Sequence, residues 1–584
     1  MSLPDFTTQA ELFSTAGLSG CLFGPSDRYR LFAQKVFPAL ARTRSQLQAC
    51  YCADNGRVAL EPVLLLGVSL LQYLEGIPDR QAVELLRYHA GWSFALNRQV
   101  GDAVFHPTTL VNFRQRLLAH DLGAIGFTAV LEALMEAGLV ARKSRQRLDS
   151  TQMFGQVSKM SRLDCVRESL RLALPEIARQ LKSGELPEWW PRLWERYVES
   201  QTDYRAGGET LARKLVEAGS DTQRLLAWLS EQPKGLTQGE QVGLLARVFG
   251  EQFEVRAGGA ASQPQSQEPV DAVSASVPPS EQEPASQVPE AGVVVEPKGK
   301  GQFASDRVQN PHDPEATYAV KGQGEKKKEH VGYKVQVAET VCEAKLAPGE
   351  PTRNFIVGMV THPAYQSDEA GDLQMEAEQR AMGLEPPPVH YVDGAYVSAQ
   401  KLVEAKAQGR EIIGPAQPAL QKDGRFSAQD FQINVEERTA LCPAGRTNTQ
   451  CSRLEQESDG KVSYRFEFST HCQDCPLRER CLGKDQRHRT LVVGEHHTAL
   501  QARRQEQQTP AFKERMKHRN AIEGTQSELV RAHGMRRARY RGLAKAKLQN
   551  YWIGAACNVK RWLRRTAWEL QSALTAQPSP TPAS

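Results

Sequence analysis

Three carboxylates stand in sequence settings that could together hold divalent cations. Asp149 lies in Arg-Leu-Asp-Ser-Thr just before a strand-like run, Asp393 ends a second such run, and Glu523 lies in a basic, helix-like stretch. Mg²⁺ prefers carboxylate and water ligands, and two ions about 3.5–4 Å apart can activate a nucleophile and steady a leaving oxygen in phosphoryl transfer. Any one of these acids could instead be a surface carboxylate or a turn cap. Together they predict a metal-dependent site for phosphoryl transfer.

A second group of residues has the spacing of a metal-binding loop. Five of the 11 cysteines fall between Cys442 and Cys481, and two residues separate Cys472 from Cys475. Two thiolates at that spacing can chelate one ion from a single turn, and Cys442 with Cys481 would complete a tetrahedral zinc site. We expect a structural Zn²⁺ that fixes a loop with no core of its own and takes no part in catalysis.

Other ligands and other states of this loop remain open. Cys451 and His471 lie close enough in sequence to compete as zinc ligands. A loop of reduced, metal-free thiols and an iron–sulfur cluster are the two alternatives to zinc.

Charge is distributed unevenly along the 584 residues, although the net charge is only +5. Between Gln501 and Leu570 there are 17 Lys and Arg against 5 Asp and Glu, whereas the span from Ala257 to Pro297 has 6 acids and no base. Clustered, unneutralised basic residues attract phosphates, so a nucleic acid is the expected partner. A well-solvated helix face is the alternative explanation of such a run.

Neither a signal peptide nor a membrane span is expected. The N-terminus lacks a basic start followed by an apolar core. The most apolar stretch, Val63 to Leu71, is far shorter than the roughly 20 residues of a membrane helix. We therefore expect a cytoplasmic, nucleoid-associated protein.

The N-terminal half of the chain reads as mostly helical. Residues 28–140 suit a compact helical DNA-binding head, or a dimerisation bundle that makes no DNA contact. Residues 161–255 are predicted to be helical again. No aromatic residue occurs between Phe253 and Phe303, so residues 256–300 are predicted to be a disordered linker that cannot bury enough surface to fold.

Strands and helices alternate in the following block. The predicted strands are residues 330–340, 354–361, 389–393 and 410–415, and the predicted helices are residues 367–382 and 398–408. Alternation of this kind implies crossover connections and a mixed sheet with helices packed on it. Residues 417–493 carry the cysteines and break the pattern, and Pro510 to Arg565 is predicted to be helical throughout.

Several motifs occur in the order found in one known family. Leu148-Asp-Ser-Thr and Tyr391-Val-Asp-Gly-Ala-Tyr carry the first two acids. Arg519-Asn-Ala-Ile-Glu-Gly-Thr, followed by Gly534-Met-Arg-Arg-Ala-Arg-Tyr-Arg-Gly, carries the third and is the most specific. Together they resemble the DDE transposases of bacterial insertion sequences, which have a ribonuclease H-like core.

Two further segments carry the same resemblance. Leu71-Gln-Tyr-Leu-Glu-Gly-Ile-Pro-Asp and Thr108-Thr-Leu-Val-Asn-Phe-Arg are similar to the InsH-type N-terminal domain of that family. His312-Asp-Pro-Glu-Ala, followed by Gly332-Tyr-Lys-Val, resembles the segment that leads into its second strand. Asp313 could be a further site acid, but a turn residue before Pro314 is the favoured reading.

The resemblance implies roles for individual residues. Asp149, Asp393 and Glu523 would be the catalytic triad that binds Mg²⁺ (or Mn²⁺). The expected DNA-binding residues, most of which should contact backbone phosphates rather than bases, are Arg519, Arg531, Arg536, Arg537, Arg539, Arg541 and Lys545. Met516 and Val530 stand where the family often has Tyr and Lys.

The expected fold class is α/β, with a ribonuclease H-like mixed sheet and flanking helices after an all-α N-terminal domain. The expected domains are residues 1–140 (helical N-terminal domain), 141–160 (first core strand), 161–255 (helical insert), 256–300 (disordered linker), 301–416 (catalytic core), 417–493 (Cys-rich zinc lobe), 494–575 (C-terminal core helices) and 576–584 (disordered tail).

The expected function is that of an insertion-sequence transposase. It would bind the terminal inverted repeats of its element as a homodimer, cleave a DNA strand, and join the freed end to target DNA. A related nuclease that cuts without joining, and a non-catalytic zinc-containing DNA-binding regulator derived from a transposase, are the alternatives.

Overall fold

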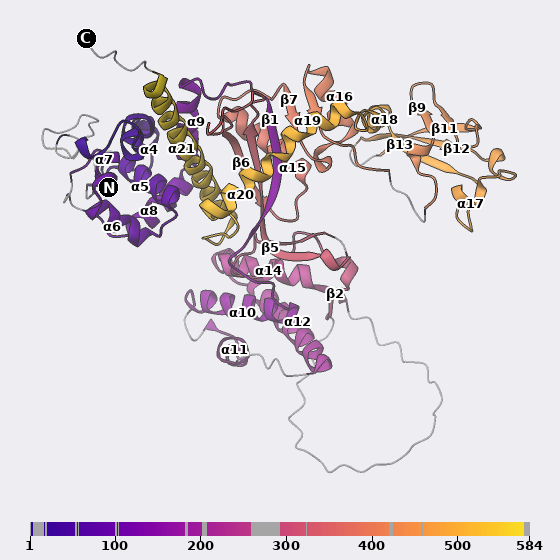
Figure 1. Cartoon of the computed structure of the whole chain (residues 1–584). Helices are drawn as coiled ribbons and strands as arrows, with labels where there is room; N and C mark the ends of the chain where they lie inside the picture. Colours follow the sequence, from indigo (N-terminus) through magenta and orange to yellow (C-terminus); the bar gives the residue numbers. More distant parts are fainter. Residues whose placement is uncertain are drawn as a thin grey trace, which may run out of the picture. The chain divides into compact units, whose positions relative to one another are not determined.

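The computed structural model covers two compact units, one formed by Met1–Phe154 with Tyr333–Ser584 and the other by Gly155–Gly332 (Figure 1). The described residues are 2–3, 17, 20–52, 55–56, 58–99, 102, 104–181, 185–200, 207–257, 293–322, 324–419, 424–456 and 460–576. Most of the predicted linker at 256–300, and nearly all of the predicted tail at 576–584, lie outside the described residues.

Short helices form the N-terminal region of the first unit, as the sequence predicts. They are α2 (Arg28–Leu31), a π-helical turn (Phe32–Val36), α3 (Phe37–Ala41), α4 (Arg44–Gln48), α5 (Pro62–Glu75), α6 (Asp79–Tyr88), α7 (Ala90–Ala95), α8 (Thr108–Ala119) and α9 (Ile125–Glu136). Glu61 caps α5 by accepting a hydrogen bond from the Val63 N–H. Gly76 ends the helix because its φ of +71° lies in the left-handed region that favours glycine.

A mixed sheet lies at the centre of the first unit, with strand order β6-β5-β1-β7-β8. Its strands are β1 (Gln146–Phe154), β5 (Lys328–Thr340), β6 (Ile356–Pro363), β7 (Val389–Tyr391) and β8 (Glu411–Ile413). β5 and β6 are antiparallel, whereas β7 is parallel to both β1 and β8. This sheet, with its flanking helices and helical N-terminal region, confirms the predicted α/β fold class.

The helices that flank the sheet begin where the sequence supplies capping residues. They are α15 (Asp368–Ala381), α16 (Ala399–Ala407), α18 (His497–Glu506), α19 (Pro510–Asn520), α20 (Ile522–His533) and α21 (Leu543–Ala576). Ser367, Ser398 and Thr509 each accept a hydrogen bond from the backbone N–H three residues later. α19 packs on β1, β7 and β8, and α20 packs on β1.

The long helix α21 packs against both the sheet and the N-terminal helices. It contacts β6 on one side and α5 and α9 on another (Figure 1). At Gly554 a Cβ atom would lie 2.5 Å from Met359 Sδ on β6 and 3.0 Å from the Phe127 ring on α9. The close approach of these elements therefore requires a residue without a side chain.

The segment between α20 and α21 corrects the prediction of continuous helix from Pro510 to Arg565. Gly534, with φ of +72°, ends α20, and residues 534–542 form a loop before α21 begins. The loop pairs with the end of β1, where the Phe154 N–H donates to Arg536 O at 2.9 Å and the Ala538 N–H donates to Phe154 O at 2.8 Å. The arginine-rich run therefore lies beside the strand that carries Asp149.

The cysteines lie in a lobe built from small antiparallel sheets. Its elements are β9 (Gln432–Asn434), β10 (Thr439–Leu441), β11 (Gln450–Glu455), β12 (Val462–Glu467), α17 (Arg478–Cys481) and β13 (Thr490–Gly494). β9 pairs with β10, and β12 pairs with both β11 and β13. The expectation that this region lacks a core is wrong, because Phe431, Phe466, Phe468 and Leu491 are buried together.

The second unit is mainly helical and has its own hydrophobic core. Its elements are α10 (Arg162–Ala178), α11 (Trp190–Trp194), a π-helical turn (Glu195–Glu199), α12 (Gly208–Ser230), α13 (Lys234–Thr237), α14 (Glu240–Gln252), β2 (Phe253–Ala257), β3 (Val293–Pro297) and β4 (Thr317–Lys321). β4 pairs with the first residues of β5. Asp313 lies in a turn, where its carbonyl accepts from the Ala316 N–H.

Among the helices of the described residues, none has both the length and the apolar character that crossing a bilayer demands.

Candidate active site

Strands β1 and β7 hold two of the three predicted acids side by side. In this parallel pair, Arg147 lies opposite Tyr391. Asp149 and Asp393 each lie two residues beyond that pair, so they occupy equivalent positions along neighbouring strands. β7 ends at Tyr391, and Asp393 follows in the short turn Gly394–Tyr396.

One carboxylate oxygen of each aspartate is fixed by the backbone. Asp149 Oδ1 accepts from the Ser150 N–H, and Asp393 Oδ1 accepts from the Ala395 N–H, both at 2.8 Å. These bonds orient the second oxygen of each side chain. That second oxygen, Oδ2 in both residues, faces the guanidinium of Arg519.

The third acid arrives from the junction of α19 and α20. Arg519 lies in the last turn of α19, and Glu523 lies in the first turn of α20, four residues later. Arg519 Nη2 lies 2.9 Å from Asp149 Oδ2 and 3.7 Å from Asp393 Oδ2, while Nη1 lies 3.4 Å from Glu523 Oε1. One guanidinium thus contacts all three carboxylates, which come from segments hundreds of residues apart.

The three acids differ in their access to solvent. The side chain of Asp149 is 11% exposed, that of Asp393 38% and that of Glu523 71%, and Arg519 is 15% exposed. The group is therefore open on the Glu523 side and closed at Asp149. A large substrate could approach from the open side.

The charges and donor atoms of this cluster fit a divalent cation. Three carboxylates and one guanidinium leave a net negative charge, and the group already gathers around a positive side chain of the chain itself. Carboxylate oxygens are the ligands that Mg²⁺ and Mn²⁺ prefer. The arrangement therefore suits a metal held by Asp149, Asp393 and Glu523.

A buried ion network fastens the strands and helices that carry the acids. Glu339 on β5 is fully buried and pairs at 2.5 Å with both Arg147 on β1 and Arg561 on α21. It also accepts a hydrogen bond from the Thr525 hydroxyl on α20 at 2.7 Å. Arg147 in turn donates to the backbone carbonyl of His518 on α19 at 3.1 Å. The sequence alone did not point to Glu339 or Arg561.

A second acid extends this network toward the surface. Glu528 on α20 pairs with Arg561 and with Lys560, each at 2.9 Å. Burial alone would raise the pKa of Glu528, but Arg561 and Lys560 lower it to about 2. Glu528 is therefore ionised at neutral pH, and it joins α20 to α21.

Tyr396 is a residue of the second acid's motif to which the sequence assigned no role. Its side chain is almost fully buried. Burial raises the pKa of its hydroxyl well above the usual range, and the nearby carboxylates of Asp368, Asp149 and Asp393 raise it further. Tyr396 therefore stays protonated close to the two aspartates.

The predicted DNA-contacting residues differ in position. Arg531, Arg536, Arg537, Arg541 and Lys545 are all exposed. Arg539 is only half-exposed, and its guanidinium lies over the Tyr73 ring at 4.7 Å. Arg519 contacts the acids themselves.

Another group of potential ligands lies on α20 and α21. Ligand atoms of Glu528, His533 and Cys557 lie within 4.8 Å of one another. Both carboxylate oxygens of Glu528 already pair with Lys560 and Arg561. Two positive side chains thus occupy the place that a cation would need.

Two regions of the chain match known protein families. A family described as Transposase DDE domain matches residues 441–563, and a family described as Transposase domain (DUF772) matches residues 21–116. Both regions of the chain are therefore similar to transposase domains. No curated protein and no solved structure matches it.

The two matches cover only part of the chain. The DDE match includes Arg519, Glu523 and the cysteines from Cys442 to Cys481, whereas Asp149 and Asp393 lie outside both matches. The predicted resemblance is confirmed, and the transposase domains support an enzyme that cleaves and transfers DNA. The roles of the individual acids rest on their geometry.

Proposed function

We propose that this transposase cleaves DNA at the terminal inverted repeats of its element and joins the freed ends to target DNA. The observation that carries the proposal is the contact of Asp149, Asp393 and Glu523 with the single guanidinium of Arg519. Two ends must be brought together for insertion, so a homodimer acting on nucleoid DNA is part of the proposal.

The acids would act together on one phosphodiester at a time. Asp149, Asp393 and Glu523 would hold Mg²⁺ or Mn²⁺, which when bound lowers the pKa of water and neutralises charge on the phosphate oxygens. Hydrolysis places a water oxygen on phosphorus and releases a 3′-hydroxyl. In the second step that hydroxyl attacks a target phosphate and displaces a 3′-oxygen, so neither step requires a covalent bond to the protein.

The chain's own residues would set the geometry of both steps. The Ser150 and Ala395 N–H groups hold Asp149 and Asp393 in place, so their oxygens need little reordering during reaction. Arg519 forms ion pairs with the acids, and it would give up one of these pairs to bind a phosphate oxygen of the DNA. The exposed arginines of the loop 534–542 would hold the DNA backbone beside β1.

The test is strand cleavage and strand transfer with DNA that carries the element ends and a supercoiled target. We expect Asp149→Asn, Asp393→Asn and Glu523→Gln each to lose both activities, because each removes a charged metal ligand with little change in shape. Glu514→Gln is the matched control, since Glu514 on α19 is exposed and pairs with Lys517 on the surface. Substantial strand transfer by Asp393→Asn would refute the assignment.

The same assay separates the rival functions. Cleavage without joining would indicate a nuclease, and binding of end-containing DNA without cleavage in Mg²⁺ would indicate a non-catalytic regulator. Both rivals would retain the exposed arginines, so DNA binding alone does not distinguish them from a transposase.

A further inference from the structure

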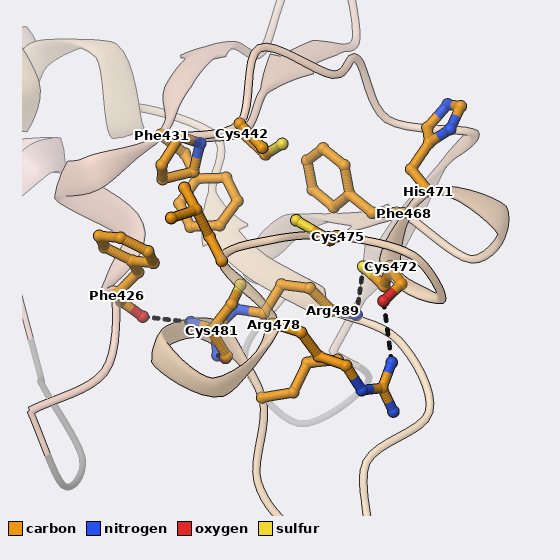
Figure 2. A pocket seen from close by; sticks show the side chains of 14 residues that line it. Phe426, Phe431, Cys442, Phe468, His471, Cys472, Cys475, Arg478, Cys481 and Arg489 are labelled. Carbon is orange, nitrogen blue, oxygen red and sulfur yellow. Dashed lines mark hydrogen bonds between the residues drawn. The ribbon is translucent and has the colours of Figure 1, made fainter.

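Four cysteine side chains of the lobe face one small cavity. Cys442, Cys472, Cys475 and Cys481 line a cavity of about 20 Å³ (Figure 2). That volume is roughly the space that one water-sized sphere needs. All four cysteines are free thiols, so each can offer its sulfur to an ion in that space.

The four cysteines reach this cavity from four separate positions in the lobe. Cys442 opens the turn Cys-Pro-Ala-Gly, in which the Gly445 N–H donates to Cys442 O at 2.8 Å and Gly445 adopts a φ of +75°. Cys472 ends one short helical turn, Cys475 follows in the next turn, and Cys481 ends α17. A pair of thiolates two residues apart, with two others closing a tetrahedron, is the donor arrangement of structural zinc sites.

Arginine side chains hold the backbone around the cavity. Arg489 donates through its guanidinium to Cys481 O at 3.1 Å, and Arg478 donates to Cys472 O at 2.8 Å. The backbone N–H of Arg489 also donates to Cys472 Sγ at 3.4 Å (Figure 2). Hydrogen bonds of this kind orient metal ligands and reduce the charge on the sulfur.

Of the two competing ligands, only His471 lines the same cavity. Cys451 lies on β11, where it pairs with Phe466 of β12, and it does not line the cavity. The His471 ring points away from the four sulfurs in Figure 2, although its backbone carbonyl accepts from Arg446 at 2.5 Å. Neither side chain is placed to complete the tetrahedron.

We propose that Cys442, Cys472, Cys475 and Cys481 bind one Zn²⁺ that locks the turns of this lobe together. Binding forms four Zn–S bonds and releases four thiol protons to solvent, which leaves the centre with a net charge of −2. The guanidinium groups of Arg478 and Arg489, which line the same cavity, offset that charge. The apolar core of the lobe packs its short strands together, and the metal fixes the turns that carry the sulfurs.

The test is metal content and cobalt spectroscopy on the full chain. Purified protein should hold about one Zn per chain, and replacement by Co²⁺ should give the thiolate charge-transfer and visible bands of tetrahedral cobalt. Cys475→Ser should lose both the zinc and these bands. Cys451→Ser and His471→Ala, the matched controls, should keep them.

Several results would overturn the proposal. Protein without zinc that also fails to take up Co²⁺, or protein that holds iron with the absorption of an iron–sulfur cluster, would do so. Zinc that survives Cys475→Ser but falls in Asp149→Asn would place the metal at the acid site instead. Loss of zinc in His471→Ala would replace the four-cysteine set with one that includes the histidine. Because the cobalt bands are measured on the unaltered chain, the proposal stays testable even if Cys475→Ser fails to fold.

Discussion

Replacing Glu339 with Ala should destabilise the protein severely, although Glu339 lies outside the acid cluster. The substitution removes the carboxylate that pairs with both Arg147 and Arg561 and leaves the Thr525 hydroxyl without that acceptor. The two arginine side chains are each 6% exposed and Glu339 is 1% exposed, so water cannot replace the lost partner.

The size of the effect follows from which arginine loses its partners. Arg561 retains its ion pair with Glu528 and its hydrogen bond to the Asn354 carbonyl, whereas Arg147 retains its hydrogen bond to the His518 carbonyl and loses its ion pair. Breaking a buried pair by removing one member costs about 3–5 kcal/mol. Against a total stability of about 5–15 kcal/mol, such a loss is large.

Urea denaturation measures this loss directly. The midpoint for Glu339→Ala should fall with little change in slope. Glu514→Ala is the control, because Glu514 pairs with Lys517 on the surface and such pairs contribute about 0–1 kcal/mol. If Glu339→Ala and Glu514→Ala unfold at the same urea concentration, the buried ion network around Glu339 does not stabilise the fold.

Three further predictions concern acid stability, helix packing and DNA binding. Burial lowers the pKa of His533 from its usual 6.5 to about 4, and the paired cations lower that of Glu528 from 4.5 to about 2. Both groups bind protons more readily in the unfolded chain than in the folded one. The free energy of unfolding should therefore fall as the pH drops below about 6.5, and fall further below about 4.5. A urea midpoint that stays constant from pH 7 to 3 would contradict this. Gly554→Ala should lower the free energy of unfolding by about 1–3 kcal/mol, because the added methyl group would meet Met359 and Phe127. Gly243→Ala, in open space on α14, should be neutral or stabilising. Equal changes in the thermal unfolding midpoint of the two variants would show that the packing around Gly554 is loose. Arg536→Ala and Arg541→Ala should each reduce the salt dependence of DNA binding by about one counterion. Arg171→Ala is the control, because Arg171 pairs with Glu168 on α10, and it should leave the salt dependence unchanged. If the slope of affinity against salt concentration is unchanged in the first two variants, the loop 534–542 does not contact DNA.

Much of the fold could be predicted from local sequence patterns. Val-rich runs such as that of β5 and serine caps such as Ser367 act over a few residues, so strands and helices could be placed before the structure was known. The break at Gly534 had a local signal as well, because a glycine after the last helical turn is a common helix end. The core of the cysteine lobe was missed because its aromatic residues are spread across short strands.

The three acids of the site could be predicted from the sequence, whereas the residues that contact and support them could not. The motifs around Asp149, Asp393 and Glu523 singled out three acids that the structure places around the guanidinium of Arg519. Nothing in the sequence shows that Arg519 contacts all three acids, because the contacts join separate strands and a helix. The pairing of Glu339 with Arg561 spans 222 residues, and no local pattern can indicate a contact at that separation.

The central claim is that acids from three distant segments share one metal site. Fe²⁺ placed in that site, with ascorbate and peroxide, generates radicals that cut the polypeptide close to the bound ion. We expect cuts near residues 149, 393 and 523 together, and loss of all three cuts in Asp149→Asn. Cutting at only one of these segments, or a pattern that Asp149→Asn leaves unchanged, would contradict the account.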